Sequence, residues 1–136
     1  MLRRTGRALV VLTVAAAALA LAACGSDDYA NDPRPPVPAE IAVLINNRQV
    51  IVSPGDFGAG LVSFSVANLS DNDASLEIDG PTADESDSIP PGGNTTLKME
   101  TETGDYTATA NGTFAAPLVF AVGPERPSAQ NELLLP

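Results

Sequence analysis

The sequence predicts an all-β protein, an antiparallel Greek-key β-sandwich of about seven strands. Seven short apolar runs follow one another between residues 39 and 123, and in most of them apolar and polar side chains alternate at every second position. Turn-forming Gly, Pro, Asn or Asp residues separate the runs. Beyond the first 23 residues no stretch keeps the period of 3.6 residues that a helix requires. Many short strands at this spacing are typical of two packed sheets.

The first two runs form a hairpin or a single bent strand. Residues 41–45 are apolar throughout, residues 50–52 are β-branched, and Asn46 and Asn47 follow the first run. Asparagine side chains stabilise turns by bonding to the backbone, so the chain reverses or bends here. A Ser-Pro-Gly-Asp turn at residues 53–56 comes next.

The other five runs complete the sandwich. The alternating pattern of a half-buried strand recurs in residues 62–66, 76–79, 97–100 and 106–110. Residues 118–122 are apolar on both faces, as expected of a central strand. We expect Phe64, Tyr106 and Phe120 to carry a small core together with the aliphatic runs, and Lys98 to point to solvent.

The first 23 residues have the order of a secretory signal. Three arginines, Arg3, Arg4 and Arg7, precede an apolar run over residues 8–23 that only Thr13 interrupts. A transmembrane helix needs roughly 20 apolar residues and this run is shorter, so we favour an export signal over a membrane span. Ordinary secretion with release is the other alternative, but it leaves an unpaired thiol in an oxidising compartment.

The end of this apolar run is more specific. Leu21, Ala22 and Ala23 lead directly into Cys24, and this ending resembles the lipobox of bacterial lipoproteins. The resemblance implies cleavage before Cys24, acylation of that cysteine, and anchoring of the mature protein on the extracytoplasmic face of the cell membrane. Two or more acyl chains hold a protein stably on a membrane, whereas a single chain binds only marginally.

The chain is therefore expected to have four parts. These are a signal peptide (residues 1–23), the lipidated cysteine with a flexible Pro-rich tether (24–38), the β-sandwich domain (39–123) and a C-terminal tail (124–136). The tether holds four prolines and three aspartates with almost no large apolar side chain, so it cannot pack a core. The tail either frays or adds an edge strand through its leucines at 133–135.

The order of the expected elements resembles the cupredoxin-like β-sandwich. After an early strand and a Pro-Gly turn comes a strand that ends at Asn68, then a Pro-Gly-rich turn at residues 89–93 and a Gly-Asp-Tyr approach to a late strand. Immunoglobulin-like domains are a second resemblance, because Glu102, Gly104 and Tyr106 alternate before the penultimate strand. In that family the tyrosine bonds back to the backbone and holds a corner.

Neither resemblance brings its family's chemistry with it. Cupredoxins place a histidine a few residues after the position of Asn68, then a cysteine, a histidine and often a methionine after the position of Tyr106. Here the first place holds Ala74 and Ser75, and residues 107–114 contain none of these ligands. A blue-copper centre needs thiolate and imidazole donors, so the resemblance implies the fold without the copper. The immunoglobulin disulfide is missing too.

Few reactive groups remain after export. The chain has no histidine and Cys24 is its only cysteine, which removes an intrachain disulfide and a His-based triad or metal site. Loss of the leader leaves four basic residues against 17 acidic ones, so nucleic acid is a poor partner. We therefore expect no enzyme, no cofactor and no small-molecule substrate.

Carboxylates are the only abundant reactive groups. Asp71 and Asp73 flank Asn72 in a turn, and they are weak candidates for calcium ligands because Ca²⁺ takes six or more oxygens. The spacing does not follow the twelve-residue calcium loop, which has a central glycine and a closing glutamate. We favour solvated loop charge, and the same interpretation applies to the acids at residues 84–87.

Taken together, the sequence predicts a membrane-anchored, exported lipoprotein that acts as a non-enzymatic binding or accessory module. Its expected partners are the membrane, through the acyl chains on Cys24, and an unidentified protein. Two alternatives remain open: a calcium-binding or ligand-binding protein that uses loop carboxylates, and a copper-free cupredoxin-like accessory of a copper-handling or respiratory assembly.

Overall fold

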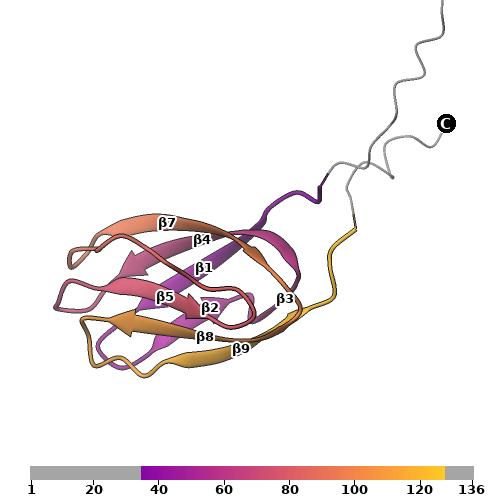
Figure 1. Ribbon diagram of the computed structural model, residues 1–136. Coiled ribbons are helices and arrows are strands. Elements are labelled where there is room, and N and C mark those ends of the chain that lie inside the picture. The colour runs from indigo at the N-terminus through magenta and orange to yellow at the C-terminus, as the bar shows by residue number, and fades with distance from the viewer. Residues whose placement is uncertain (1–34, 128–136) are drawn as a thin grey trace, which may run out of the picture. The chain divides into compact units, whose positions relative to one another are not determined.

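Two β-sheets packed face to face form the part of the chain that the computed structural model describes, residues 35–127 (Figure 1). The strands are β1 (Ala39–Ile45), β2 (Val50–Ser53), β3 (Asp56–Gly58), β4 (Gly60–Asn68), β5 (Ser75–Asp79), β6 (Asp84–Glu85), β7 (Asn94–Thr101), β8 (Gly104–Asn111) and β9 (Leu118–Gly123). One sheet has the order β2-β1-β4-β7 and the other has the order β3-β9-β8-β5-β6. The all-β sandwich predicted from the sequence is confirmed.

Several sequence predictions concern residues outside the described part. The lipobox residues Leu21, Ala22, Ala23 and Cys24, most of the tether, and the leucines of the tail all lie there. Within residues 35–127, no helix is long and apolar enough to cross a membrane.

The seven predicted runs correspond to β1, β2, β4, β5, β7, β8 and β9. The sequence did not predict β3 and β6, which have three and two residues. Strands this short contain less than two full periods of alternation, so their pattern cannot be distinguished from that of a turn.

The sheets are mixed, whereas the sequence predicted purely antiparallel pairing. β1 runs parallel to β4, with Ile41 opposite Phe64, and β3 runs parallel to β9. After β2 the chain crosses to the second sheet and forms β3. It then returns to the first sheet as β4, which lies beside β1 and runs in the same direction as β1. Alternation shows which face of a strand is buried but not the direction of its neighbour, so the sequence pattern could not show these two pairs.

The predicted hairpin of the first two runs is confirmed. β1 and β2 are antiparallel, with Ile45 opposite Val50. The Asn46 side-chain oxygen accepts hydrogen bonds from the backbone N–H groups of Arg48 (2.8 Å) and Gln49 (2.9 Å). This local side-chain bonding stabilises the turn, as expected of asparagine.

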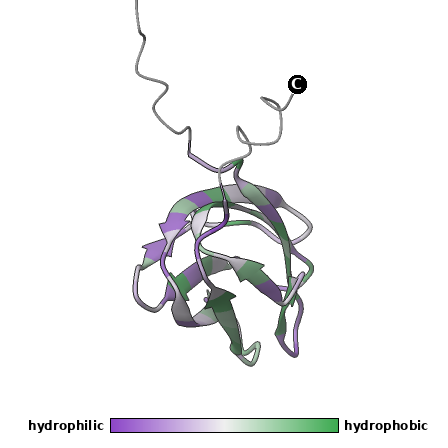
Figure 2. Ribbon diagram, turned by 90° about the vertical axis from the view of Figure 1, so that its right-hand side faces the viewer, coloured by the Kyte–Doolittle hydropathy of each residue, from purple (hydrophilic) through white to green (hydrophobic). Residues whose placement is uncertain are grey.

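Aromatic rings fill the space between the sheets. Phe64, Tyr106 and Phe120 are buried, as the sequence predicted. Tyr106 stacks on Phe120 with ring centroids 5.7 Å apart, and Phe57 of β3 lies 6.2 Å from Phe64. Figure 2 shows the strands of both layers curving around this common interior. The rings add directional contacts to the burial of apolar surface.

β9 is a central strand, as the sequence predicted, because it lies between β3 and β8, but only one of its faces is buried. Phe120 and Val122 face the core, but Val119 is 67% exposed. β9 lies next to the short edge strand β3, and its apolar run includes side chains that face water. The continuous apolar pattern therefore reflects composition rather than burial on both faces.

The strand order follows the cupredoxin-like alternative and not the immunoglobulin one. In an immunoglobulin sheet the second strand lies between the first and the fifth. Here the first strand lies between the second and the fourth. The turn and strand sequence predicted from the cupredoxin-like resemblance, including a strand that ends at Asn68 and a late strand that contains Tyr106, is present in this order.

Tyr106 bonds back to the backbone and holds a corner, as the immunoglobulin-like resemblance implied. The backbone N–H of Glu102 donates to the Tyr106 hydroxyl oxygen at 2.9 Å. That hydroxyl also lies 2.9 Å from Thr82 Oγ1, which donates its own proton to the carbonyl of Glu100 at 2.8 Å. Since a threonine hydroxyl has one proton, the Tyr106 hydroxyl donates to Thr82. The chain of bonds ties the β5–β6 connection to the turn between β7 and β8.

The chain enters and leaves the sandwich at the same end (Figure 1). Arg126 joins the two segments there: its guanidinium donates to the carbonyls of Gly58 (3.1 Å), Val37 (2.5 Å) and Leu61 (2.5 Å). Its own backbone N–H donates to the carbonyl of Ala59 at 3.1 Å. One side chain thus fixes the entering segment, the β3–β4 region and the segment after β9 to one another.

Candidate functional site

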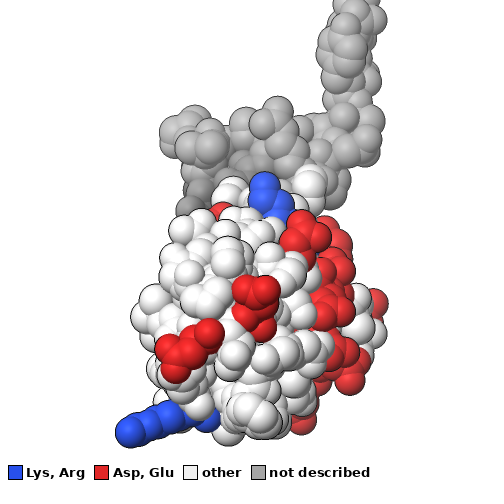
Figure 3. All heavy atoms as spheres, turned by 90° about the vertical axis from the view of Figure 1, so that its left-hand side faces the viewer, with Lys and Arg blue, Asp and Glu red and all other residues white. Residues whose placement is uncertain are grey.

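Four turns lie at the other end of the sandwich, and we call this region the loop end. It consists of residues 46–49 between β1 and β2, 69–74 between β4 and β5, 90–93 before β7, and 112–117 between β8 and β9. Figure 3 views the molecule from this end. Much of the surface in view is uncharged, and Asp and Glu side chains gather along one flank.

Hydrogen bonds join the turns of the loop end into one unit. Asn47 and Asp71 bond reciprocally: the Asn47 amide donates to the Asp71 carboxylate at 2.8 Å, and the Asp71 backbone N–H donates to the Asn47 side-chain oxygen at 3.0 Å. The backbone N–H of Ala116 donates to the carbonyl of Arg48 at 2.8 Å. The backbone N–H of Leu69 donates to the carbonyl of Ile45 at 2.7 Å.

Asn68 supports the loop end from below. It is fully buried, and its amide group donates to the carbonyls of Asn72 and Ile89, both at 2.8 Å. Its side-chain oxygen accepts from the backbone N–H of Ser70 at 3.0 Å and from the Ser70 hydroxyl at 2.6 Å. Both donors and both acceptor positions of the amide are therefore used, so this buried polar group carries no desolvation penalty.

The positions where a cupredoxin would hold copper do not fit the metal. Ala74 is buried, and its backbone pairs with Ile89 in both directions (3.0 and 2.7 Å). Ala110 is buried as well. A Cβ added to Gly112 would lie 2.5 Å from the carbonyl oxygen of Asp73, so the backbones of two turns already touch here. Methyl groups and backbone occupy the place of the thiolate and imidazole donors that copper requires.

The two calcium candidates, Asp71 and Asp73, lie in one turn. Asp71 is exposed, and its carboxylate accepts the hydrogen bond from Asn47, so it joins two turns. Asp73 is exposed too. Among residues 35–127, no group of three or more His, Cys, Asp or Glu side chains comes close enough to hold a metal ion.

A second polar cluster lies on the outer face of the five-stranded sheet. Asn111 donates to the carboxylates of Glu77 (2.9 Å) and Glu85 (3.2 Å), and the Ser75 hydroxyl donates to Glu85 at 2.6 Å. The hydrogen bond from Ser75, and then that from Asn111, lowers the pKa of the Glu85 carboxyl, because both stabilise its charged form. This cluster links β5, β6 and β8 through side-chain hydrogen bonds.

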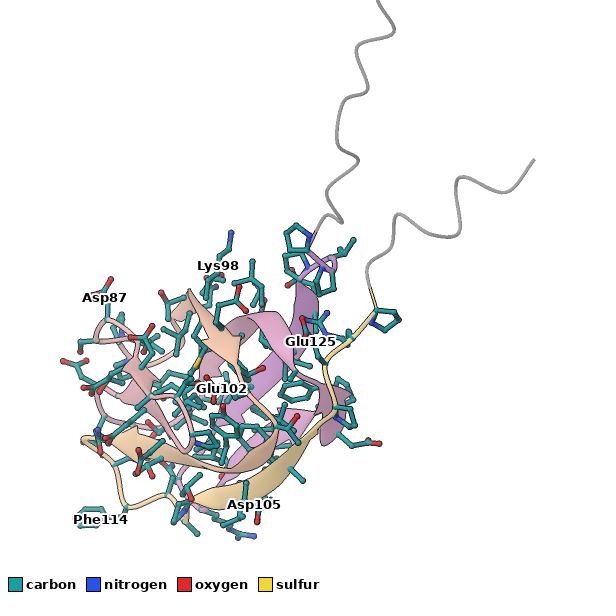
Figure 4. All side chains as sticks on the ribbon, turned by 45° about the vertical axis from the view of Figure 1, so that its right-hand side comes forward. Asp87, Lys98, Glu102, Asp105, Phe114 and Glu125 are labelled. Carbon is teal, nitrogen blue, oxygen red and sulfur yellow. The ribbon has the colours of Figure 1, made fainter. Side chains whose placement is uncertain are left out.

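The loop end also exposes two large apolar side chains that the sequence analysis did not single out. Phe114 is 98% exposed at the tip of the β8–β9 turn, and Leu69 is 59% exposed in the β4–β5 turn. Figure 4 shows Phe114 pointing away from the body of the domain, at the end opposite Glu125. The available signal was an aromatic residue directly after a Gly-Thr turn, outside every alternating run.

Two solved structures resemble this chain at low identity. One is the crystal structure of a multicopper oxidase, at 19% identity and a TM-score of 0.49 over 66% of this chain. The match spans 46% of the oxidase chain, which is less than half its length. The other is a chain from a cryo-EM structure of a heme-copper terminal oxidase dimer, at 15% identity and a TM-score of 0.44. This match covers 92% of the present chain and 100% of the oxidase chain.

No protein-family model and no curated protein matches the sequence. At these identities and TM-scores, the two structures carry no argument about what this chain does. The residues themselves define a stable platform of bonded turns with two exposed apolar side chains.

Proposed function

We propose that this protein is an exported, lipid-anchored and non-enzymatic module that binds another protein at the extracytoplasmic face of the cell membrane. The observation that carries the proposal is the fixed separation of the two ends of the sandwich. Arg126 holds the entering and leaving segments together at one end, and the loop end lies at the other. A domain tethered by its N-terminal side leaves the loop end free for a partner.

The anchor is supported by the leader. Leu21, Ala22 and Ala23 precede Cys24 in the order of a lipobox, and the described domain begins shortly after it. From Cys24 to Val37 the chain spans roughly 45 Å when fully extended, which is enough to hold the domain clear of lipid headgroups.

The non-enzymatic part is supported by the chemistry of the side chains. Nucleophilic catalysis by Ser or Thr needs a nearby base, and the chain has no histidine and one lysine, Lys98, which is exposed on β7. Asn and Ser side chains donate hydrogen bonds to the carboxylates of Asp71, Glu77 and Glu85. Such bonds stabilise the structure, and those to Glu85 lower the pKa of its carboxyl, whereas a general acid needs a raised pKa.

A narrower form of the proposal places the partner in a copper-handling or respiratory assembly. It is supported by the cupredoxin-like order of the strands, since a copper-free domain of this fold can serve such an assembly through its surface. Identification of the partner tests the narrower form.

The anchor is tested by separating membranes from soluble protein in cells that produce the full chain. We expect wild type in the membrane fraction with an acylated N-terminal cysteine by mass spectrometry. Cys24→Ala should be released or remain unprocessed. Asn31→Ala, a change in the tether beyond the lipobox, is the matched control and should behave as wild type. A processed Cys24→Ala protein that stays in the membrane would contradict the anchor.

A further inference from the structure

Phe114 is an apolar side chain that the fold holds out to water. The turn that carries it is fixed at several points: the Thr113 hydroxyl donates to the carbonyl of Ala110 at 2.9 Å and accepts from the backbone N–H of Ala115 at 3.2 Å. Beyond it, the carbonyl of Ala116 accepts from the backbone N–H of Val50 at 3.0 Å. A partner that buries Phe114 therefore has little chain to order, and rigid aromatic anchors of this kind dominate binding energy at interfaces.

The rest of the loop end extends this contact. Leu69, in the β4–β5 turn, adds a second exposed apolar side chain. The bonded pair Asn47–Asp71 links the β4–β5 turn to the β1–β2 turn. The β1–β2 turn is bonded to the β8–β9 turn, which carries Phe114, through Arg48 and Ala116. Apolar side chains surrounded by polar groups are typical of the centre and rim of a protein interface.

The charge around this surface defines the partner. The loop end contains two carboxylates, Asp71 and Asp73, and one cation, Arg48. Across residues 35–127 there are 13 Asp and Glu against three Lys and Arg. Figure 3 shows the acidic side chains beside the uncharged part of this end. Electrostatic complementarity favours a partner with basic groups, and an anionic lipid surface repels the domain.

We infer that the loop end is a docking surface on which Phe114 inserts into an apolar pocket of a partner protein whose rim carries Lys or Arg. The inference rests on the proposed function, because the anchor leaves this end free. Phe114 is the central contact, Leu69 adds a second apolar side chain within the same loop end, and the carboxylates of Asp71 and Asp73 meet the basic rim.

The test uses the full, lipidated chain in its own membranes with photoreactive p-benzoylphenylalanine at position 114 or at position 119. Val119 is the matched control, since it is an exposed apolar residue on the outer face of β9 and not in the loop end. Irradiation should link position 114 to one protein segment that contains apolar and basic side chains. The yield from position 119 should be roughly tenfold lower, and about 0.5 M NaCl should lower the yield from position 114 several-fold.

A second measurement uses alanine variants against the partner so identified. Phe114→Ala should reduce its recovery at least tenfold, whereas Val119→Ala should not, and both variants should keep the wild-type unfolding midpoint. Equal yields from both positions, links only to lipid, links only to a second copy of this chain, or a captured segment without Lys or Arg would each overturn the inference. Capture of a protein from position 119 alone would reject the loop end as the docking surface and leave the proposed binding function standing. Failure to capture any protein from either position would reject both the docking surface and the proposed binding function.

Discussion

Single polar residues occur in the interior of this domain only where their bonds are complete. No buried side-chain nitrogen or oxygen among residues 35–127 lacks a hydrogen-bond partner. Asn68 is the most deeply buried of the polar residues, with 0% exposure, and it joins the end of β4 to Asn72, Ile89 and Ser70. Its role is to hold three chain segments in register under the loop end.

Asn68→Ala should lower the free energy of unfolding by about 2 kcal/mol, because it leaves the buried N–H of Ser70 without a partner and removes one of the two hydrogen bonds that the carbonyl of Ile89 accepts. Urea unfolding measures the change. Asn94→Ala, at the exposed start of β7, is the control and should stay within about 0.5 kcal/mol of wild type. Equal stability of the two variants would show that water replaces the lost bonds.

Glu85 gives the domain a defined response to acid. Its folded pKa is lowered, so its contribution to stability is present above its ordinary pKa of 4.5 and is lost as the pH falls through the lower, folded value. Ser75→Ala removes the stronger of the two hydrogen bonds. We expect this variant to melt below wild type at about pH 7, with the gap closing below about pH 4. A gap that is constant with pH would assign the effect to packing instead.

At the residue scale, the sequence predicted the apolar anchors better than the polar ones. Phe64, Tyr106 and Phe120 were predicted as core from alternation and are buried. The bonds of Asn68 and Asp71 were not predicted, because each depends on residues brought close by the fold, such as Ile89 and Asn47, 21 and 24 positions away in sequence. Side-chain type alone does not show where such partners will lie.

Among elements, the strands were predictable from local pattern and their pairing was not. The seven apolar runs each form a strand. The parallel pairs β1–β4 and β3–β9 depend on the chain crossing between sheets after β2, and a two-residue or three-residue strand leaves no periodic signal. The candidate site could not be predicted from local pattern either, because the loop end forms only when the fold brings four separate turns together.

The contact between the turns of the loop end constrains Gly112. Its φ of +84° is rarely adopted by other residues, and a Cβ there would lie 2.5 Å from the carbonyl of Asp73. Gly112→Ala should therefore lower the free energy of unfolding by about 2 kcal/mol. Gly55→Ala is the matched control: nothing lies within 4 Å of its added Cβ, so it should change stability by less than about 0.5 kcal/mol. Chemical denaturation compares the two, and equal effects would mean that the turn relaxes freely.

The Asn47–Asp71 pair separates a structural role from a calcium site. Asp71→Ala removes an exposed tie between two turns and should cost about 1 kcal/mol in unfolding free energy, with Asp73→Ala as the control in the same turn. Calcium at about 1 mM should leave the melting temperature of wild type and both variants unchanged, since a ligand stabilises only the state that binds it. Stabilisation of wild type by calcium that Asp71→Ala abolishes would establish the calcium-binding alternative.

Over the whole molecule, charge is distributed unevenly between the two sheets. The outer face of the five-stranded sheet carries acids and no Lys or Arg: Asp56, Glu77, Asp79, Glu85 and Asp105. The outer face of the four-stranded sheet carries mostly small or apolar side chains, and its charged residues are Glu40, Glu100 and Lys98. Like charges on one face repel one another and lower the stability of the compact state.

This repulsion should make the stability of the domain depend on salt. Asp56 and Asp105 both lie opposite Ala121, from strands on either side of β9, so their backbones are about 10 Å apart, within the screening length at low salt. Raising NaCl from about 10 mM to about 0.3 M should raise the melting temperature by a few degrees. Asp56→Asn combined with Asp105→Asn should reduce this rise, whereas Glu125→Gln, in the segment after β9, should reduce it less. A rise of the same size in all three proteins would mean that salt acts through general burial of apolar surface rather than through this face.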